Sequence, residues 1–192
     1  MALTRSVAPV LAPVDLARLQ AHMRLEAGED DDHLQHCLDV AIAQFDGADG
    51  ELGRALMDQT WRETFAAVPG NGQGVALTLL PVREIVQAEI RDANGDWIAV
   101  EGVTLEDLEG DRSAVFAPSW GAPGRHRWPL RIDYVAGFGA EPGAVPLPIC
   151  HAILLFAAHL YKAREPVTFE GTPVEVPLSI ARLVAPFKSW WM

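Results

Sequence analysis

The chain contains little cysteine. Cys37 and Cys150 are the only two among 192 residues, and both stand within apolar stretches of helical character. Two such residues cannot supply the disulfide framework of a small secreted domain, and isolated cysteines in apolar surroundings behave as small buried hydrophobes. We therefore expect the protein to be made in a reducing compartment, the cytoplasm.

Long apolar runs are also missing. No stretch approaches the roughly 18–20 consecutive apolar residues that a membrane-spanning helix requires. The N-terminal sequence MALTRSVAPVLAPVD is interrupted by Pro9 and Pro13 and has no continuous signal-peptide core. We expect a soluble protein with no membrane partner.

Positive charge is scarce and unevenly placed. The chain has 15 basic and 26 acidic residues, a formal charge of −11. Residues 1–120 hold 8 of the basic and 21 of the acidic residues, giving −13, whereas residues 121–192 carry +2. An acidic body disfavours binding to a nucleic-acid backbone, which requires Lys and Arg to displace counterions. The asymmetry is consistent with an oriented protein–protein contact or with ordinary solubility charge, and the sequence leaves both open.

Apolar residues are plentiful, at 49% of the chain, which is enough for the core of one domain. A helix is predicted over about 14–25, with Leu16, Leu19 and Met23 on one stripe. A second is predicted over 30–46, where the acidic residues 29–32 stand at its amino end and favour the helix dipole. A third is predicted over 146–164.

The periodicity changes from 3.6 to 2 at Gln59, so we predict an antiparallel β region over about 59–135. Strands are expected around 59–65, 75–79, 86–90, 113–116 and 128–135. The turn Asp92–Gly95 is expected to form a hairpin leading to Trp97. The fold class is therefore α+β: a helical body of two or three long helices, an antiparallel β region inserted between them, and an extended C-terminal arm over 166–192. Residues 1–165 form the main domain, and 179–184 can form a short amphipathic helix within the arm.

The glycines at 137, 139 and 143 follow a strand and precede a long helix, which is also the layout of a phosphate-binding loop. Their spacing is GxGxxxG instead of GxGxxG, and Pro146 and Pro148 delay the helix. The GKS or GKT ending of a P-loop is absent. We interpret the segment as a turn whose glycines allow the strand and the helix to pack closely, and we expect no cofactor.

Asp30, His33 and His36 have the spacing of residues on one helix face and are candidate ligands of a metal ion. A metal site needs three or four ligands, and no CxxC or HExxH motif accompanies these residues. His151 and His159 on the later helix form a weaker pair. No GxSxG motif surrounds a serine, so no catalytic nucleophile stands out.

The chain ends in APFKSWWM, in which Phe187, Trp190 and Trp191 are interleaved with Lys188. Exposed tryptophans are unfavourable in water, so these side chains pack back onto the domain or anchor a partner. Because Trp and Arg dominate interface hot spots, we favour a partner anchor.

Four segments, taken in order, resemble the head–tail connector (adaptor) family of long-tailed phages and phage-derived gene transfer agents. They are VDLARLQAHMRLEAGEDDDHLQHCLDVAIAQF, LGRALMDQTW, LRIDYVAGFGAEPGAVPLPICHAILLFAAHLYKARE and VPLSIARLVAPFKSWW. They are similar to the family's first two helices, its Gly-Arg-x-Leu segment, its strand-turn-helix unit and its closing tail. Departures from the pattern are the glycine-rich FDGADGELGRAL and the region 95–127, which is long enough for an added loop or strand pair.

The resemblance implies a non-enzymatic structural protein that is made and assembled in the bacterial cytoplasm and is located at the head–tail junction of a virion or virion-like particle. Family members form a ring, typically of twelve copies, between the portal protein and the stopper or tail-completion protein, and DNA passes through the channel without specific binding. The tail of each subunit is expected to dock on the portal through Leu183, Phe187, Lys188, Trp190 and Trp191. Channel-facing acidic residues are expected at Asp30, Asp31 and Asp32. The alternatives are a small metal-dependent enzyme using Asp30, His33 and His36, and a soluble protein-binding module.

Overall fold

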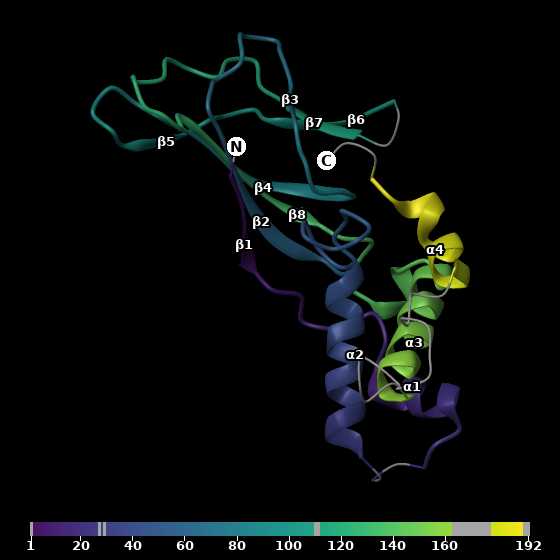
Figure 1. The fold of residues 1–192 in the computed structure, drawn as a ribbon. Helices are drawn as coiled ribbons and strands as arrows, with labels where there is room; N and C mark the ends of the chain where they lie inside the picture. Colours follow the sequence, from purple (N-terminus) through teal and green to yellow (C-terminus); the bar gives the residue numbers. More distant parts are fainter. Residues whose placement is uncertain (1, 27, 29, 110–111, 163–177, 190–192) are drawn as a thin grey trace.

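Helices gather at one end of a twisted sheet, and a second, smaller sheet covers one face of it (Figure 1). The computed structural model describes residues 2–26, 28, 30–109, 112–162 and 178–189. The strands are β1 Ala2–Val7, β2 Gln59–Phe65, β3 Val75–Ala76, β4 Val82–Arg91, β5 Trp97–Ala99, β6 Thr104–Leu108, β7 Arg112–Phe116 and β8 Leu130–Ala136. The helices are α1 Leu16–Met23, α2 Asp31–Phe45, α3 Leu147–Lys162 and α4 Leu178–Val184, with short 3₁₀ helices at Pro142–Ala144 and Ala185–Phe187.

The larger sheet has the order β1-β2-β8-β4-β5, and the smaller one β3-β7-β6, with antiparallel pairing throughout. The last of the described strands, β8, lies at the centre of the larger sheet. Its inner residues Ile132 and Tyr134 are fully buried, and they pack with Trp61, Ala88 and Val115 in one apolar cluster. The alternation of apolar residues along β2, β4 and β8 thus produces the core between the two sheets.

A separate apolar cluster holds the helices together. Leu34, Leu38 and Phe45 of α2 are buried against Ile149 and Ile153 of α3. These residues recur at helical spacing, so one stripe of each helix faces the other. The side chain of Asp15 accepts a hydrogen bond from the Arg18 amide at 2.8 Å and caps α1, as expected of an aspartate at that position.

The α+β class is confirmed, as are the strands around 59–65, 113–116 and 128–135 and the hairpin at Asp92–Gly95. One expectation was wrong: the β region is not simply inserted between helices, because β1 precedes α1 and pairs with β2. Residues 95–127, for which a loop or a strand pair was expected, contain the pair formed by β6 and β7. The strand expected over 75–79 is only Val75–Ala76, because Thr78 and Leu79 donate their amides to Glu63 and Tyr134 instead of to a neighbouring strand.

The C-terminal arm is not extended over residues 178–187. This part forms α4 and a 3₁₀ helix, which confirms the short helix expected at 179–184. Ile180 and Val184 stand four residues apart, on one face of α4, and both are buried in the helical cluster. Residues 166–177, 190, 191 and 192 lie outside the described residues.

The glycine turn between β8 and α3 is a close-packed joint, as its composition indicated. A Cβ atom at Gly137 would lie 2.4 Å from the carbonyl carbon of Met57 and 2.5 Å from the amide nitrogen of Asp58. The Gly137 amide donates to Pro81, and the Phe138 amide donates to Leu56. The turn therefore joins three separate segments of backbone, with no space for a side chain at Gly137.

Gly137→Ala is therefore expected to lower the free energy of unfolding by about 2 kcal/mol, since backbone on both sides must shift. Gly143→Ala is the matched control in the same turn. A Cβ atom at Gly143 meets nothing within 4 Å, so this change should be neutral or slightly stabilising. Urea denaturation of both variants measures the difference, and equal stabilities would contradict the close-packing interpretation.

Candidate functional site

The described end of the C-terminal segment is fastened to the domain. Leu183 and Phe187 are partly buried against the helical cluster. The Arg54 guanidinium donates to the Phe187 carbonyl at 2.5 Å, and the Lys188 ammonium pairs with the Glu51 carboxylate at 2.7 Å. The Ser189 amide donates to the Leu52 carbonyl at 2.9 Å. The chain is therefore held beside Leu52 at Ser189, the residue before Trp190. Trp190 and Trp191 lie outside the described residues.

The acidic residues at the start of α2 lie at the end of the helical group that is far from the sheets (Figure 1). Asp31 has a local structural role, because its carboxylate accepts hydrogen bonds from the Gly28 amide and from the Gln20 side chain. Asp30 accepts from the Tyr161 hydroxyl at 3.4 Å. Asp30 and Asp32 are exposed, so their charge is presented to solvent at this end.

The three candidate metal ligands do not converge. His33 lies against Tyr161, with ring centroids 5.5 Å apart, and its Nε2 atom is 3.9 Å from the Cys37 sulfur, whereas His36 is exposed. His151 forms an edge-to-face contact with His22 at 5.7 Å. Within the described ranges, no group of three His, Cys, Asp or Glu side chains is placed to hold a metal ion.

A groove lies between the segment that follows β1 and the carboxyl half of α2. It has a volume of about 460 Å³. Its lining includes Pro9–Pro13 on one side, Asp39, Ile42 and Asp49 on the other, and Leu56 and Met57. We call it the N-terminal groove. No pattern in the sequence indicated this groove, because it is assembled from three separate segments.

One carboxylate is buried inside the sheet core. Glu63 is fully buried and accepts hydrogen bonds from the Thr78 hydroxyl at 2.6 Å, the Thr78 amide at 3.1 Å and the Tyr134 hydroxyl at 3.0 Å. Burial raises the pKa of Glu63, and these hydrogen bonds offset part of the rise. Glu63 is inaccessible to solvent, so we assign it a structural role. Its hydrogen bonds link β2 to β8 and to the segment after β3.

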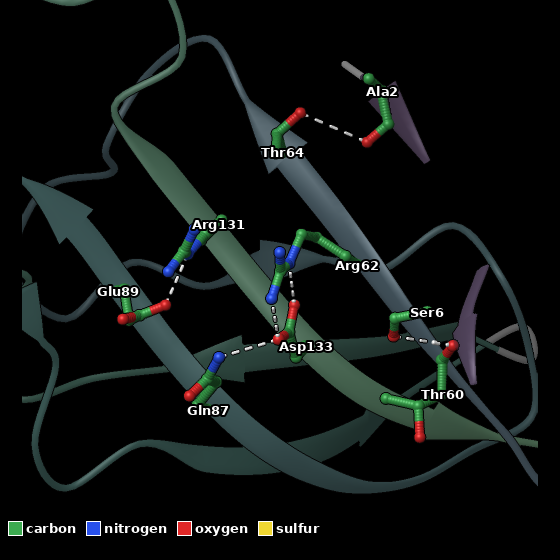
Figure 2. Close-up of polar contacts among 9 residues, drawn as sticks. All are labelled: Ala2, Ser6, Thr60, Arg62, Thr64, Gln87, Glu89, Arg131 and Asp133. Atoms are coloured by element: carbon green, nitrogen blue, oxygen red, sulfur yellow. Dashed lines mark hydrogen bonds and ion pairs between the residues drawn. The ribbon is translucent and has the colours of Figure 1, made fainter. Parts of the chain in front are cut away.

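The outer face of the larger sheet carries a row of paired polar side chains (Figure 2). Arg62 forms a two-fold contact with Asp133 at 2.7 Å, and Gln87 donates to the same carboxylate at 2.8 Å. Arg131 pairs with Glu89. Burial alone would raise the pKa of Asp133, but hydrogen bonds from Arg62 and Gln87 lower it below its usual value. These contacts link β2, β8 and β4, and they pair each of the two arginines with a carboxylate.

The loop before β8 carries positive charge. Residues 112–132 include four arginines and contain no aspartate or glutamate. Arg125 and Arg127 are exposed, and the Arg127 guanidinium lies 5.8 Å from the Trp128 ring centroid. We call residues 125–128 the arginine loop. No prediction was made for this loop, although the absence of acidic residues from residues 112–132 is a pattern that could have indicated it.

Four surface features can contact other molecules. They are the C-terminal segment held on the domain, the N-terminal groove, the arginine loop and the acidic start of α2. The described helices include none that is both long and apolar enough to cross a membrane.

No family model and no curated protein matches the sequence. Solved structures do match the fold. The similar chains come from the neck of an empty gene transfer agent particle computed with C6 symmetry (TM-score 0.78), the virion of a native gene transfer agent particle (TM-score 0.75) and the neck of a native particle computed with C12 symmetry (TM-score 0.73). In each case 24% of residues are identical, and the match covers 100% of this chain and 97% of the other. The likeness establishes a shared fold over the whole of this chain and 97% of the others.

Proposed function

We propose that this chain is a structural head–tail adaptor subunit, which forms a ring beneath the portal of a DNA-filled head and links it to the stopper or tail-completion protein. The observation that carries the proposal is the fold likeness to chains of gene transfer agent necks, which spans 100% of this chain and 97% of theirs. One of those necks was computed with C12 symmetry, in keeping with a ring of twelve copies. The place of action is the head–tail junction of a virion or virion-like particle.

The C-terminal segment is the proposed portal-docking element. Leu183 and Phe187 pack on the helical cluster, and Lys188 pairs with Glu51, so these residues fix the segment in place. Trp190 and Trp191 follow directly and supply the aromatic contact with the portal. Many copies in one ring multiply the affinity of each single contact.

The negative charge of residues 1–120 is suited to a channel through which DNA passes without binding, because negative side chains repel the phosphates. Asp30, Asp31 and Asp32 are proposed to face that channel. Asp30 and Asp32 are exposed at one end of the helical group, as residues that face a channel would be.

The test is electron microscopy of the purified chain mixed with purified portal, alongside co-sedimentation. We expect one ring of this protein on the portal, with the C-terminal segment at the junction. Failure to co-sediment at micromolar concentrations of both proteins would overturn the proposal. A ring with α2 on its outer surface would overturn only the role of residues 30–32.

A further inference from the structure

We propose that the N-terminal groove receives the arginine loop of a second copy of this chain. The inference rests on the proposed function, in which copies stand side by side in a ring, and it names the two surfaces through which neighbours meet. Each surface is incomplete by itself: one is an apolar hollow with acidic walls, and the other is a cationic loop with an aromatic side chain.

The groove is open and apolar. Val10 and Leu11, on its wall, are 95% and 45% exposed, which is unusual for large apolar side chains in successive positions. Ile42 of α2 and the buried Leu56 and Met57 continue the apolar lining. The volume of about 460 Å³ lies within the range of roughly 300–1,000 Å³ that is typical of binding pockets. The groove therefore has room for an aromatic side chain and its neighbours.

The rim of the groove is acidic. Asp39 and Asp49 are exposed, and the lining also includes Asp46, which is partly buried. Arg5, the one cation among the described residues of the lining, lies 3.5 Å from Asp46 and donates to Gln59 at 3.2 Å. Asp39 is bonded only to a neutral partner, Gln35, among the contacts that the structure shows for it. The groove consequently favours an apolar or aromatic occupant that brings positive charge.

The arginine loop has this chemistry and is held in place. The His126 ring contacts the Asp92 carbonyl at 2.9 Å, and the Gly124 amide donates to the Arg91 carbonyl at 2.7 Å. A Cβ atom at Gly124 would lie 2.1 Å from the Asp92 oxygen, so the loop packs tightly on the β4–β5 turn. Arg125 and Arg127 stay exposed beside the partly exposed Trp128. A pre-positioned loop loses less conformational entropy when it binds.

One copy cannot bring its own two surfaces together. The arginine loop precedes Leu130, the first residue of β8, whereas the groove residues Leu56 and Met57 lie beside the turn that follows Ala136. Seven residues of strand separate the two, which corresponds to roughly 20 Å along the sheet. Figure 1 shows the start of β8 at the end of the sheet farthest from the helices. A contact between two different patches on successive copies is heterologous, and such contacts generate a ring when the rotation between copies closes.

The experiment reverses the charge on each side. One variant carries Arg125→Glu and Arg127→Glu, a second carries Asp39→Arg and Asp49→Arg, and a third carries all four. All four side chains are exposed, so the variants should fold. The matched control, Arg18→Glu with Arg24→Glu, changes the net charge as the first variant does, but on α1 and its C-terminus. Copies bound per portal are measured against free concentration, and the chain alone is followed by sedimentation at rising concentration.

The wild type and the control should load the portal cooperatively. Each double variant should require at least about tenfold more protein for half-loading and lose cooperativity, because like charges then face each other across the contact. The fourfold variant, or an equimolar mixture of the two double variants, should restore both. Wild-type loading should also weaken as salt screens the contact.

Unchanged loading by both double variants, or no restoration in the fourfold variant, would overturn the contact while leaving the adaptor function intact. A wild-type chain that does not bind the portal would instead overturn the proposed function. In that case the contact is judged from the chain alone, and a chain that stays monomeric up to millimolar concentration overturns it too.

Discussion

Glu63→Leu is expected to lower the free energy of unfolding at neutral pH by about 4 kcal/mol. The leucine leaves the Tyr134 hydroxyl and the Thr78 amide and hydroxyl without the carboxylate that accepts from them. Each buried polar group that loses its partner costs about 1–3 kcal/mol. Chemical denaturation at pH 7 measures the loss, and a change below about 1 kcal/mol would contradict this account of the core.

Glu63→Gln is the informative companion. Its carbonyl oxygen can accept from Tyr134 and the Thr78 amide, and its amide group can donate to the Thr78 hydroxyl, so the geometry of the network is kept. At pH 4 the glutamine variant should match the wild type within about 1 kcal/mol, since both side chains are then largely neutral.

The pH dependence follows from the raised pKa of Glu63. In the unfolded chain a glutamate has a pKa of about 4.3. The folded state holds its proton to higher pH, so the wild type loses stability as pH rises from the unfolded pKa through the folded one. That loss is about 1.4 kcal/mol per unit of difference in pKa. The glutamine variant lacks this loss, so its free energy of unfolding should rise relative to that of the wild type between pH 4 and pH 7. A constant difference across this range would show that Glu63 ionises without cost.

Trp190→Ala combined with Trp191→Ala is expected to weaken portal binding at least about 100-fold while leaving the thermal stability of the chain unchanged. Truncating a hot-spot tryptophan costs about 2 kcal/mol or more, and the loss is repeated in every copy of a ring. Surface plasmon resonance on immobilised portal measures the affinity, and thermal melting measures the fold.

Alanine substitution is preferable to truncation here. Removing residues 186–192 would also remove the Phe187 carbonyl, the Lys188 ammonium and the Ser189 amide, which bond to Arg54, Glu51 and Leu52. Truncation therefore mixes folding with docking. Val86→Ala with Ile98→Ala is a matched control, because both side chains are about half exposed on the sheet. Wild-type affinity in the tryptophan variant would refute the docking role.

Periodic burial made much of the fold predictable. The α2 stripe and the alternation along β2 and β8 appear in the sequence because one face of each element is buried. Strand β1 was not predicted, and β6 only as one of two options for residues 95–127, because both lie at sheet edges and are largely exposed on both faces. Backbone pairing, not side-chain burial, holds such strands, and pairing leaves no pattern in residue types.

The surfaces were harder to predict than the elements. Glu63 stands between Trp61 and Phe65 on the alternating pattern, so a buried polar group on the inner face of β2 was visible in the sequence in principle. The N-terminal groove was not visible, since residues 9–13, 39–49 and 56–57 meet only after α2 packs beside the end of the larger sheet. Asp30, His33 and His36 share a helix, but spacing alone could not show that His36 would stay exposed while His33 lay against Tyr161.

The central place of β8 has a consequence for synthesis on the ribosome. Strands β2 and β4 both pair with β8, which begins only at Leu130. At about 5–20 residues per second, the roughly 40 residues between the end of β4 and the start of β8 take several seconds to emerge. During that interval β2 and β4 each lack the strand that joins them, and their backbone edges remain open to pairing with other nascent chains. Pausing of translation between β4 and β8 would lengthen this exposure, whereas chaperone binding to residues 59–91 would shield it.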